Sequence, residues 1–245
     1  MILKKSQFFT FYDYGLNSQK KNKFFFICDH ASNKIPKKYN NLGLSKEILE
    51  SHIAWDIGAK RITLKISKAL NTKCFTSNFS RLIIDPNRKI TDPDLILKKS
   101  FENRISANTN LTPELKQKRL KFYNSYHQGL EQVLKENIDK NTILISIHSF
   151  TRNFKQSNRS TEIGLLWNKN ISTMLEVKNE LIKNHINVGN NRPYSGFFYN
   201  YTLDRHSKQK LNKNLSIEIR NDLICDKKGI KKWCNAIKNS LMKIK

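Results

Sequence analysis

The amino-acid sequence predicts one α/β domain, in which a mixed or parallel sheet carries helices on both of its faces. Short apolar runs alternate with longer segments of helical periodicity, as in sheets whose strands are joined by helices. The 245 residues are 38% hydrophobic, so a sizeable core is expected without disulfides or a structural metal. No repeat or low-complexity linker divides the chain, and residues 1–245 are therefore expected to form a single domain.

The first half of the chain predicts both strands and helices. A continuous apolar run predicts a strand buried on both faces, Ser45 has the character of a helix N-cap, and Thr112 caps a helix that has proline at its first position. In order, the expected elements are a strand over Phe24–Cys28, a helix over Lys46–Leu70, short strands over Lys73–Thr76 and Arg81–Ile84, and a helix starting at Pro113.

The second half continues the alternation of apolar runs with segments of helical spacing. The last of these is an amphipathic helix with Trp233 on its apolar face. In order, the expected elements are strands over Thr142–Ile147 and Glu162–Trp167, a helix over Ile171–His185, a strand over Leu215–Ile219 and a helix from about Gly229.

The composition is strongly basic, with 45 Lys and Arg against 20 Asp and Glu and a net charge of +25. Such a charge is typical either of a protein with an anionic partner or of drift in an A/T-rich genome. Asn and Ile are also abundant and the lysines are scattered, which favours drift, so no nucleic-acid partner is expected. No apolar run approaches the ~18 residues of a membrane span, and no signal peptide is found, so we expect a cytoplasmic protein.

Titratable residues occur at the carboxyl ends of three apolar runs, where open α/β sheets bind their ligands. They are His30, His148 and Glu218. Neutral imidazoles are good ligands for zinc and other divalent metals, and a catalytic zinc takes three protein ligands. The third ligand has to come from elsewhere. His52 and Asp56 are four residues apart, and a buried Asp56 would need either a metal or an arginine as its partner.

Three further features have side chains suited to binding or catalysis. The segment from Arg81 to Arg88 places Asn87 and an arginine in a loop, and a guanidinium binds a carboxylate with two parallel hydrogen bonds. Tyr194 lies in a loop stiffened by glycine and proline. Glu218 and Arg220 share one strand face, so they form either an ion pair or, beside a metal, a general base with a nearby cation.

The same features resemble the N-formylglutamate amidohydrolase family, in order and spacing, from about residue 23 to 240. The matching segments are Cys28–Pro36 (CDHASNKIP), Leu42–Leu44, His52–Ala59 (HIAWDIGA), Ser80–Arg88 (SRLIIDPNR), Tyr126–His127, His148–Phe150, Asn191–Gly196 (NRPYSG) with His206, and Ile217–Ile224 (IEIRNDLI).

The resemblance implies a fold akin to the zinc-dependent exopeptidases. It also implies a metal-dependent amidohydrolase that converts N-formyl-L-glutamate, or a close acidic N-acyl amino acid, to the free amino acid and a carboxylic acid. The first ligand pair of that wider group is H-x-x-E, but Asn33 stands at the second position here. The ligands of one divalent ion, expected to be zinc, are therefore taken to be His30, Asp56 and His148.

The resemblance also implies roles for the remaining residues. Glu218 matches the catalytic glutamate, and Asn87 with Arg88 matches the pair that holds a substrate carboxylate. Arg81 or Arg220 would stabilise the oxyanion, and Tyr194 would contact the substrate. Two alternatives stay open: an amidase acting on another N-acyl substrate, and a basic nucleic-acid-binding protein on a degenerate hydrolase fold.

Overall fold

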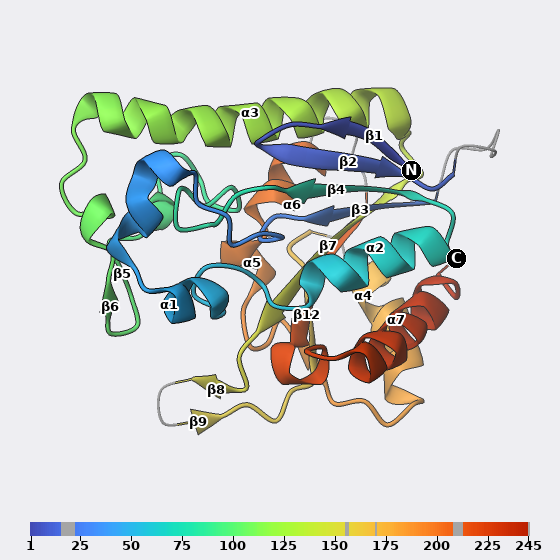
Figure 1. Cartoon of the computed structure of the whole chain (residues 1–245). Coiled ribbons are helices and arrows are strands. Elements are labelled where there is room, and N and C mark those ends of the chain that lie inside the picture. Colours follow the sequence, from blue (N-terminus) through green and yellow to red (C-terminus); the bar gives the residue numbers. More distant parts are fainter. Residues whose placement is uncertain (16–22, 155–156, 170, 208–212, 245) are drawn as a thin grey trace.

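A mixed eight-stranded sheet forms the centre of the molecule (Figure 1), in the order β1-β2-β4-β3-β7-β12-β10-β11. The computed structural model describes residues 1–15, 23–154, 157–169, 171–207 and 213–244. The four central strands are parallel, whereas β1, β2 and the β10–β11 pair add antiparallel contacts at the two edges. The strands are β1 Ile2–Lys5, β2 Phe9–Asp13, β3 Phe24–Cys28, β4 Lys73–Ser77, β7 Ile143–Phe150, β10 Ile163–Leu166, β11 Val188–Asn190 and β12 Asn214–Arg220.

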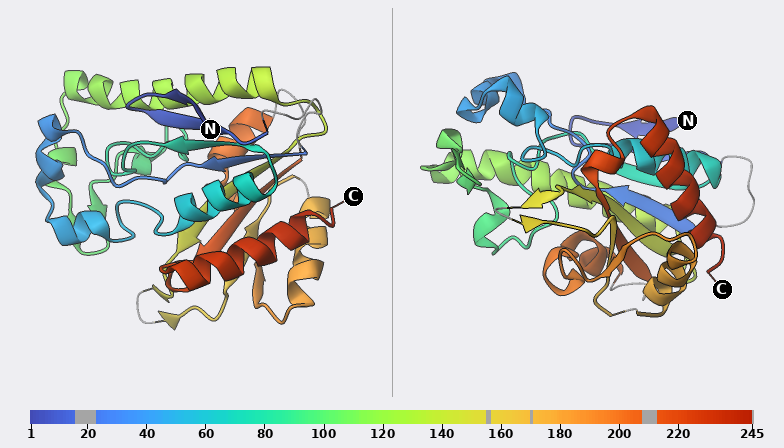
Figure 2. Two further views of the ribbon diagram at one scale, coloured as in Figure 1. Left: turned by 45° about the vertical axis from the view of Figure 1, so that its right-hand side comes forward. Right: turned by 90° about the horizontal axis from the view of Figure 1, so that it is seen from below.

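Helices cover both faces of the sheet, as expected (Figures 1 and 2). One face carries α2 (Ala59–Ala69), α4 (Ile171–Ile182) and α7 (Lys227–Leu241), and the other carries α3 (Pro113–Asn137) and α6 (Tyr201–Ser207). The remaining elements are α1 Lys46–Glu50, α5 Gly196–Tyr199, the strand pairs β5 Lys99–Ser100 with β6 Asn103–Arg104 and β8 Asn153–Phe154 with β9 Ser157–Asn158, and 3-10 turns over Lys37–Gly43, Pro93–Leu95, Ser106–Asn108 and Asn221–Leu223.

Strand β3 shows why the sheet separates two cores. Successive side chains of a strand point to opposite faces. Phe24, Phe26 and Cys28 pack into the core beneath α2 and α7, whereas Phe25 and Ile27 pack into the core beneath α3. All five side chains are buried, which confirms the prediction of a strand enclosed on both faces.

The helix expected over Lys46–Leu70 is wrong in its middle. Helix α1 ends at Glu50, α2 begins at Ala59, and the residues between them form turns. The Ser51 hydroxyl donates to the Ile48 carbonyl, and Gly58 precedes α2 with a left-handed φ of 84°. The Ser51 contact lies at the end of α1, and the left-handed backbone at Gly58 keeps a regular helix from running through to α2. The interruption matters because it lets Asp56 turn inward to the end of the sheet.

The strand expected over Arg81–Ile84 is also wrong, because these residues form a turn. The hydroxyl of Ser80 accepts a hydrogen bond from the amide of Leu82, and the Ser80 carbonyl accepts from Ile83. Local bonds of this kind replace a strand ladder. The β1–β2 hairpin was not predicted at all. No helix of the described residues is long and apolar enough to span a membrane.

Candidate active site

Three ligand-type side chains meet at the carboxyl end of the central strands. His30 follows β3, His148 belongs to the neighbouring strand β7, and Asp56 comes from the turns before α2. The candidate ligand atoms of these residues all lie within 4.8 Å of one another, and all three residues are buried. We call His30, Asp56 and His148 the triad. The spacing suits one small cation bound by two imidazoles and a carboxylate.

Each histidine of the triad is held from its far side by another carboxylate. The Nε2 atom of His30 lies 2.8 Å from Asp85, and the Nε2 atom of His148 lies 3.3 Å from Asp29. In each ring the Nδ1 atom is the one that faces Asp56, at 3.4 Å for His30 and 2.9 Å for His148. Histidines that bind metals are oriented in this way, because a carboxylate fixes the tautomer and raises ligand basicity.

The electrostatics of the triad also fit a cation. Burial alone would raise the pKa of Asp56, but the charge of His30 and the hydrogen bond with His148 hold that pKa well below its usual range. Burial opposes a charge on His148, yet Asp29 and Asp56 raise the pKa of its imidazole well above the usual value. The buried Oδ1 atom of Asp56 has no hydrogen bond among the described residues. A cation would satisfy this oxygen and displace the imidazole protons.

Glu218 lies on β12 beside the triad. It is the register partner of His148 in the parallel β7–β12 pair, so both side chains point to the same face of the sheet. Glu218 is 8% exposed, and its Oε2 atom has no hydrogen bond among the described residues. Burial is the main cause that raises the pKa of Glu218, to about 7. A carboxylate with these properties can take up and release a proton near neutral pH.

The two arginines expected near the acyl oxygen lie in different surroundings. Arg81 belongs to the site, since it donates to Asp85 at 2.8 Å and lies 3.9 Å from Asp56. Arg220 turns away and donates to Asp222 at 2.8 Å and to the Arg159 carbonyl at 3.1 Å. The ion pair considered between Glu218 and Arg220 is absent from the described residues. Arg220 is thus bound to the loops around the site, and its catalytic role stays a prediction.

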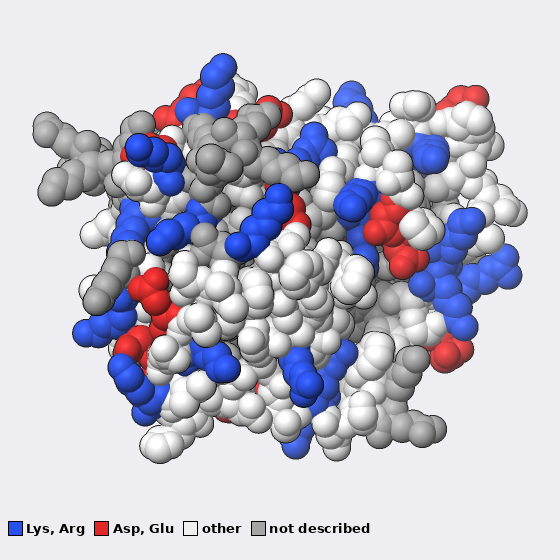
Figure 3. Space-filling model, turned by 180° about the vertical axis from the view of Figure 1, so that it is seen from behind, with Lys and Arg blue, Asp and Glu red and all other residues white. Residues whose placement is uncertain are grey.

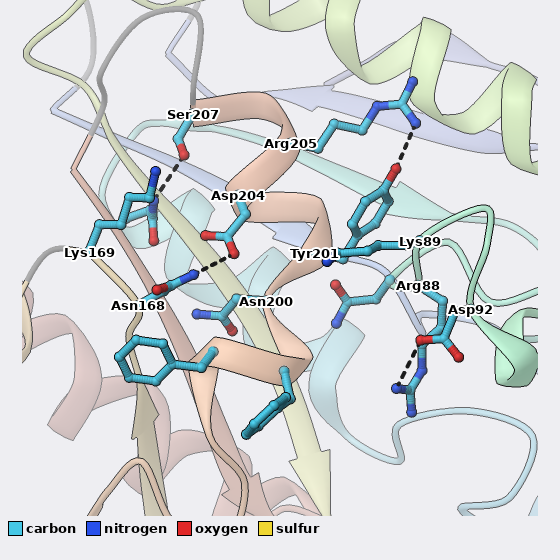
Figure 4. A pocket seen from close by; sticks show the side chains of 14 residues that line it. Arg88, Lys89, Asp92, Asn168, Lys169, Asn200, Tyr201, Asp204, Arg205 and Ser207 are labelled. Carbon is cyan, nitrogen blue, oxygen red and sulfur yellow. Dashed lines mark hydrogen bonds and ion pairs between the residues drawn. The ribbon is translucent and has the colours of Figure 1, made fainter.

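Asn87 and Arg88 border a separate cavity of about 770 Å³ (Figure 4), which no residue of the triad lines. The amide of Asn87 is engaged with backbone groups on both sides, donating to the Tyr199 carbonyl at 2.8 Å and accepting from the Thr202 amide at 3.0 Å. Arg88 lies 3.6 Å from Asp92 and over the Tyr199 ring at 5.0 Å. Asn87 thus positions the loop, while Arg88 keeps part of its guanidinium available.

Tyr194 faces the site beside an arginine that the sequence did not single out. Arg159 donates to the Tyr194 hydroxyl at 3.1 Å. Burial is the main cause that raises the pKa of Tyr194, and the negative charge of Glu218 adds to it. Asp29 and Asp85 were likewise not predicted as site residues. Both lie within the motifs noted above. Asp29 directly precedes His30 and Asp85 directly precedes Pro86, and these neighbours were the signal that could have pointed to them.

The remaining candidates stay outside the triad. The amide of Asn33 donates to the Leu49 carbonyl, which is a structural contact. His52 lies 3.7 Å from the Asp56 carboxylate, and burial lowers its pKa to about 4. His127 and His206, for which no position was settled from the sequence, form a buried pair 3.0 Å apart. Burial lowers both pKa values, to about 3 and about 4, so each ring is neutral.

On one face of the molecule the positive charge is spread out. On the face seen from behind, Lys and Arg side chains surround an area of uncharged side chains, and acidic groups lie among them (Figure 3). A nucleic-acid interface would gather cations into one stripe or patch. This face therefore gives no support to the nucleic-acid alternative.

Comparison with known proteins identifies the family. The family model described as N-formylglutamate amidohydrolase matches residues 22–225. The chain belongs to the N-formylglutamate amidohydrolase family. This membership supports hydrolysis of an amide bond in an acyl amino acid. No curated protein matches the chain.

Two solved structures share the fold of this chain. The gene product Atu2144 from Agrobacterium tumefaciens is 27% identical, with a TM-score of 0.89 over 96% of this chain and 94% of that one. N-formylglutamate amidohydrolase from Ralstonia eutropha JMP134 is 15% identical, with a TM-score of 0.67 over 96% of each chain. The expected α/β fold with a large mixed sheet is confirmed.

Proposed function

We propose that the protein hydrolyses N-formyl-L-glutamate to formate and glutamate, using one zinc ion held by His30, Asp56 and His148. The observation that carries the proposal is the meeting of this triad with the buried carboxylate of Glu218 on the adjacent strand, whose Oε2 atom has no hydrogen bond among the described residues. Two imidazoles and one carboxylate leave a position open for water or substrate. Family membership supports the reaction class.

The residues present fit a metal on the chemistry of their donor atoms. The ligand nitrogens face inward because Asp85 and Asp29 hold the opposite ring nitrogens. The Oδ1 atom of Asp56, which has no hydrogen bond among the described residues, offers a further oxygen. When bound, zinc supplies Lewis acidity that polarises a carbonyl and activates water at neutral pH.

Glu218 is the proposed general base and acid. Its carboxylate takes the proton of the attacking water and then delivers it to the nitrogen of the departing glutamate. The carboxylate lies on the same sheet face as His148, and its pKa near 7 allows both steps at neutral pH. Since no arginine pairs with it among the described residues, no ion pair has to break first.

Arg81 is the proposed cation beside the acyl oxygen. It donates to Asp85, and its second terminal nitrogen lies 3.9 Å from Asp56. A fixed guanidinium at this position stabilises negative charge that develops on the oxygen during attack. Arg88 is proposed to hold a substrate carboxylate, because its planar fork suits that group and its second terminal nitrogen has no carboxylate within 4.0 Å among the described residues.

The proposal is tested by measuring metal content and formate release on one preparation. Purified protein would be analysed for zinc and assayed with N-formyl-L-glutamate before and after chelation. We expect formate release that disappears with the metal and returns on adding zinc. Absence of formate release from the zinc-loaded protein would overturn the proposal. A parallel panel of N-acetyl-, N-succinyl- and N-formyl-glutamate would identify an amidase with another acyl group.

A further inference from the structure

Arg159 lies beside Tyr194, on the loop between β9 and β10. The β8–β9 hairpin continues from β7, the strand that carries His148, and projects from the end of the sheet (Figure 1). The guanidinium of Arg159 donates to the Thr151 carbonyl at 3.2 Å and to the Tyr194 hydroxyl at 3.1 Å. These contacts place it on the same side of the sheet edge as the triad.

Three aromatic rings fix the orientation of this guanidinium. Its central carbon lies 4.5 Å from the ring centroid of Phe154, 4.9 Å from that of Tyr194 and 5.6 Å from that of Phe150. Arginine stacks on aromatic faces, and a side chain ordered in advance loses less entropy when it binds a ligand. Arg159 is thus ordered before a ligand binds, and its remaining N–H groups donate no hydrogen bond to the described residues.

The charge of Arg159 is not neutralised within the protein. All 20 acidic residues of the chain belong to the described part, and none has a carboxylate oxygen within 4.0 Å of this guanidinium. The other arginines around the site are paired. Arg81 contacts Asp85, Arg88 contacts Asp92, and Arg220 contacts Asp222. A partly buried, ordered cation without a carboxylate partner favours an anionic ligand.

Tyr194 links this cation to the reacting groups. Its hydroxyl oxygen accepts from Arg159, so its own proton is free to be donated to a ligand. The same side chain lies close enough to Glu218 to feel its charge. A carboxylate that receives hydrogen bonds from both Arg159 and Tyr194 would therefore lie beside the proposed general base.

We propose that Arg159, assisted by Tyr194, binds one carboxylate of the substrate and selects acidic N-acyl amino acids. This inference rests on the proposed function, since it places the ligand in the same site. It assigns the second carboxylate of a dianionic substrate to a residue other than Arg88. A neutral amino acid would leave one of the two guanidinium groups without its partner.

Three substrates would test the assignment: N-formylglutamate, N-formylglutamine, which lacks the side-chain carboxylate, and N-formyl-4-aminobutyrate, which lacks the α-carboxylate. We expect Arg159→Gln to lower kcat/KM for N-formylglutamate by about 10–100-fold, as for a lost charge-assisted bond. The loss should nearly vanish for the one analogue that lacks the carboxylate bound by Arg159. An equal loss with all three substrates, or no loss, would overturn the inference.

The matched control is Arg152→Gln, an exposed arginine of the same hairpin, which should leave all three values unchanged. Arg159→Lys keeps the charge but loses the planar fork of the guanidinium. Its kcat/KM for N-formylglutamate should lie between those of the wild type and Arg159→Gln. This second variant decides the question if the glutamine variant fails to fold.

A binding measurement separates this inference from the proposed function. Glutarate would be titrated calorimetrically into the zinc-loaded wild type and Arg159→Gln proteins. We expect the variant to bind it about tenfold or more weakly. If the wild type binds glutarate through Arg159 but releases no formate, only the proposed reaction fails. If the wild type does not bind glutarate, or both proteins bind it equally, the role of Arg159 is refuted.

Discussion

The Nδ1 atom of His148 lies 2.9 Å from the Asp56 carboxylate, although 92 positions separate the two residues. The backbone makes this contact possible. The Asp56 amide donates to the His30 carbonyl at 2.9 Å, and the Ser149 amide donates to the Asp56 carboxylate at 3.2 Å. Asp56 is therefore attached to the ends of both neighbouring strands, where it completes the triad and is proposed to supply the ligand that the glutamate of an H-x-x-E pair would otherwise provide.

Replacing His148 should remove metal and activity together. His148→Ala deletes one of the three proposed ligands, and a core of this size does not depend on a single side chain at the edge of the sheet. Zinc content and far-UV circular dichroism would be measured on the same sample. The control is His206→Asn, in a buried histidine pair away from the triad, which should keep its zinc. Stoichiometric zinc in His148→Ala would exclude His148 as a ligand.

Asp85 should control metal affinity without touching the metal. Asp85→Asn removes the charge that holds His30 Nε2, and partners of this kind typically change affinity by about 10–100-fold. The dissociation constant for zinc would be measured by competition with a chromogenic chelator. Asp92→Asn, in the same loop region but paired with Arg88, provides the comparison. Equal zinc affinity in Asp85→Asn and wild type would show that the ring is held in place by other contacts.

Glu218→Gln should leave the metal bound and reduce turnover. Glutamine has nearly the shape of glutamate but cannot accept the proton of the attacking water. Loss of a general base typically costs about 10²–10⁴-fold in rate, so kcat should fall by that range. Zinc analysis and kcat for formate release provide the measurement. A variant with full zinc and near-normal kcat would end the assignment of Glu218 as the base.

The same substitution should stabilise the metal-free protein at high pH. Folding raises the pKa of Glu218 from 4.5 to about 7, so the native state favours the protonated carboxyl. The wild type therefore loses stability as the pH rises through this window, by roughly 3 kcal/mol at 1.36 kcal/mol per unit. Urea unfolding with EDTA should show Glu218→Gln more stable than wild type at pH 8, and only slightly so at pH 5. If the difference in unfolding free energy between variant and wild type were the same at pH 5 and pH 8, the burial of this charge would be contradicted.

Arg88→Lys should raise KM for N-formylglutamate several-fold. Lysine keeps the charge but loses the planar fork and the stacking on Tyr199. Steady-state kinetics give KM and kcat separately, and kcat should change little because the reacting groups lie elsewhere. The control is Lys89→Arg, a charge-preserving change at the next position of the same cavity. Unchanged KM in Arg88→Lys would mean that the loop is only structural.

Much of the fold could be predicted because its central strands and helices have local signals. The run Phe24–Cys28 is apolar throughout because it is enclosed on both faces, and Thr112 caps α3 through the amide of Leu115. The two wrong predictions of secondary structure lie where hydrogen bonds of side chains take the place of a regular backbone pattern. Ser80 turns the segment expected as a strand, and Ser51 with Gly58 interrupts the segment expected as one helix.

The sequence by itself determined which residues can meet at one edge of the sheet. His30 and Glu218 stand at the carboxyl ends of apolar runs, and parallel strands bring such ends together. The partners of these residues were decided only by the tertiary structure. Whether Arg220 pairs with Glu218 or Asp222, and whether Arg159 has a carboxylate beside it, depends on loops folded back over the sheet. Hydrogen bonds and ion pairs require contact within a few ångströms, and sequence spacing does not determine distances between residues on different loops.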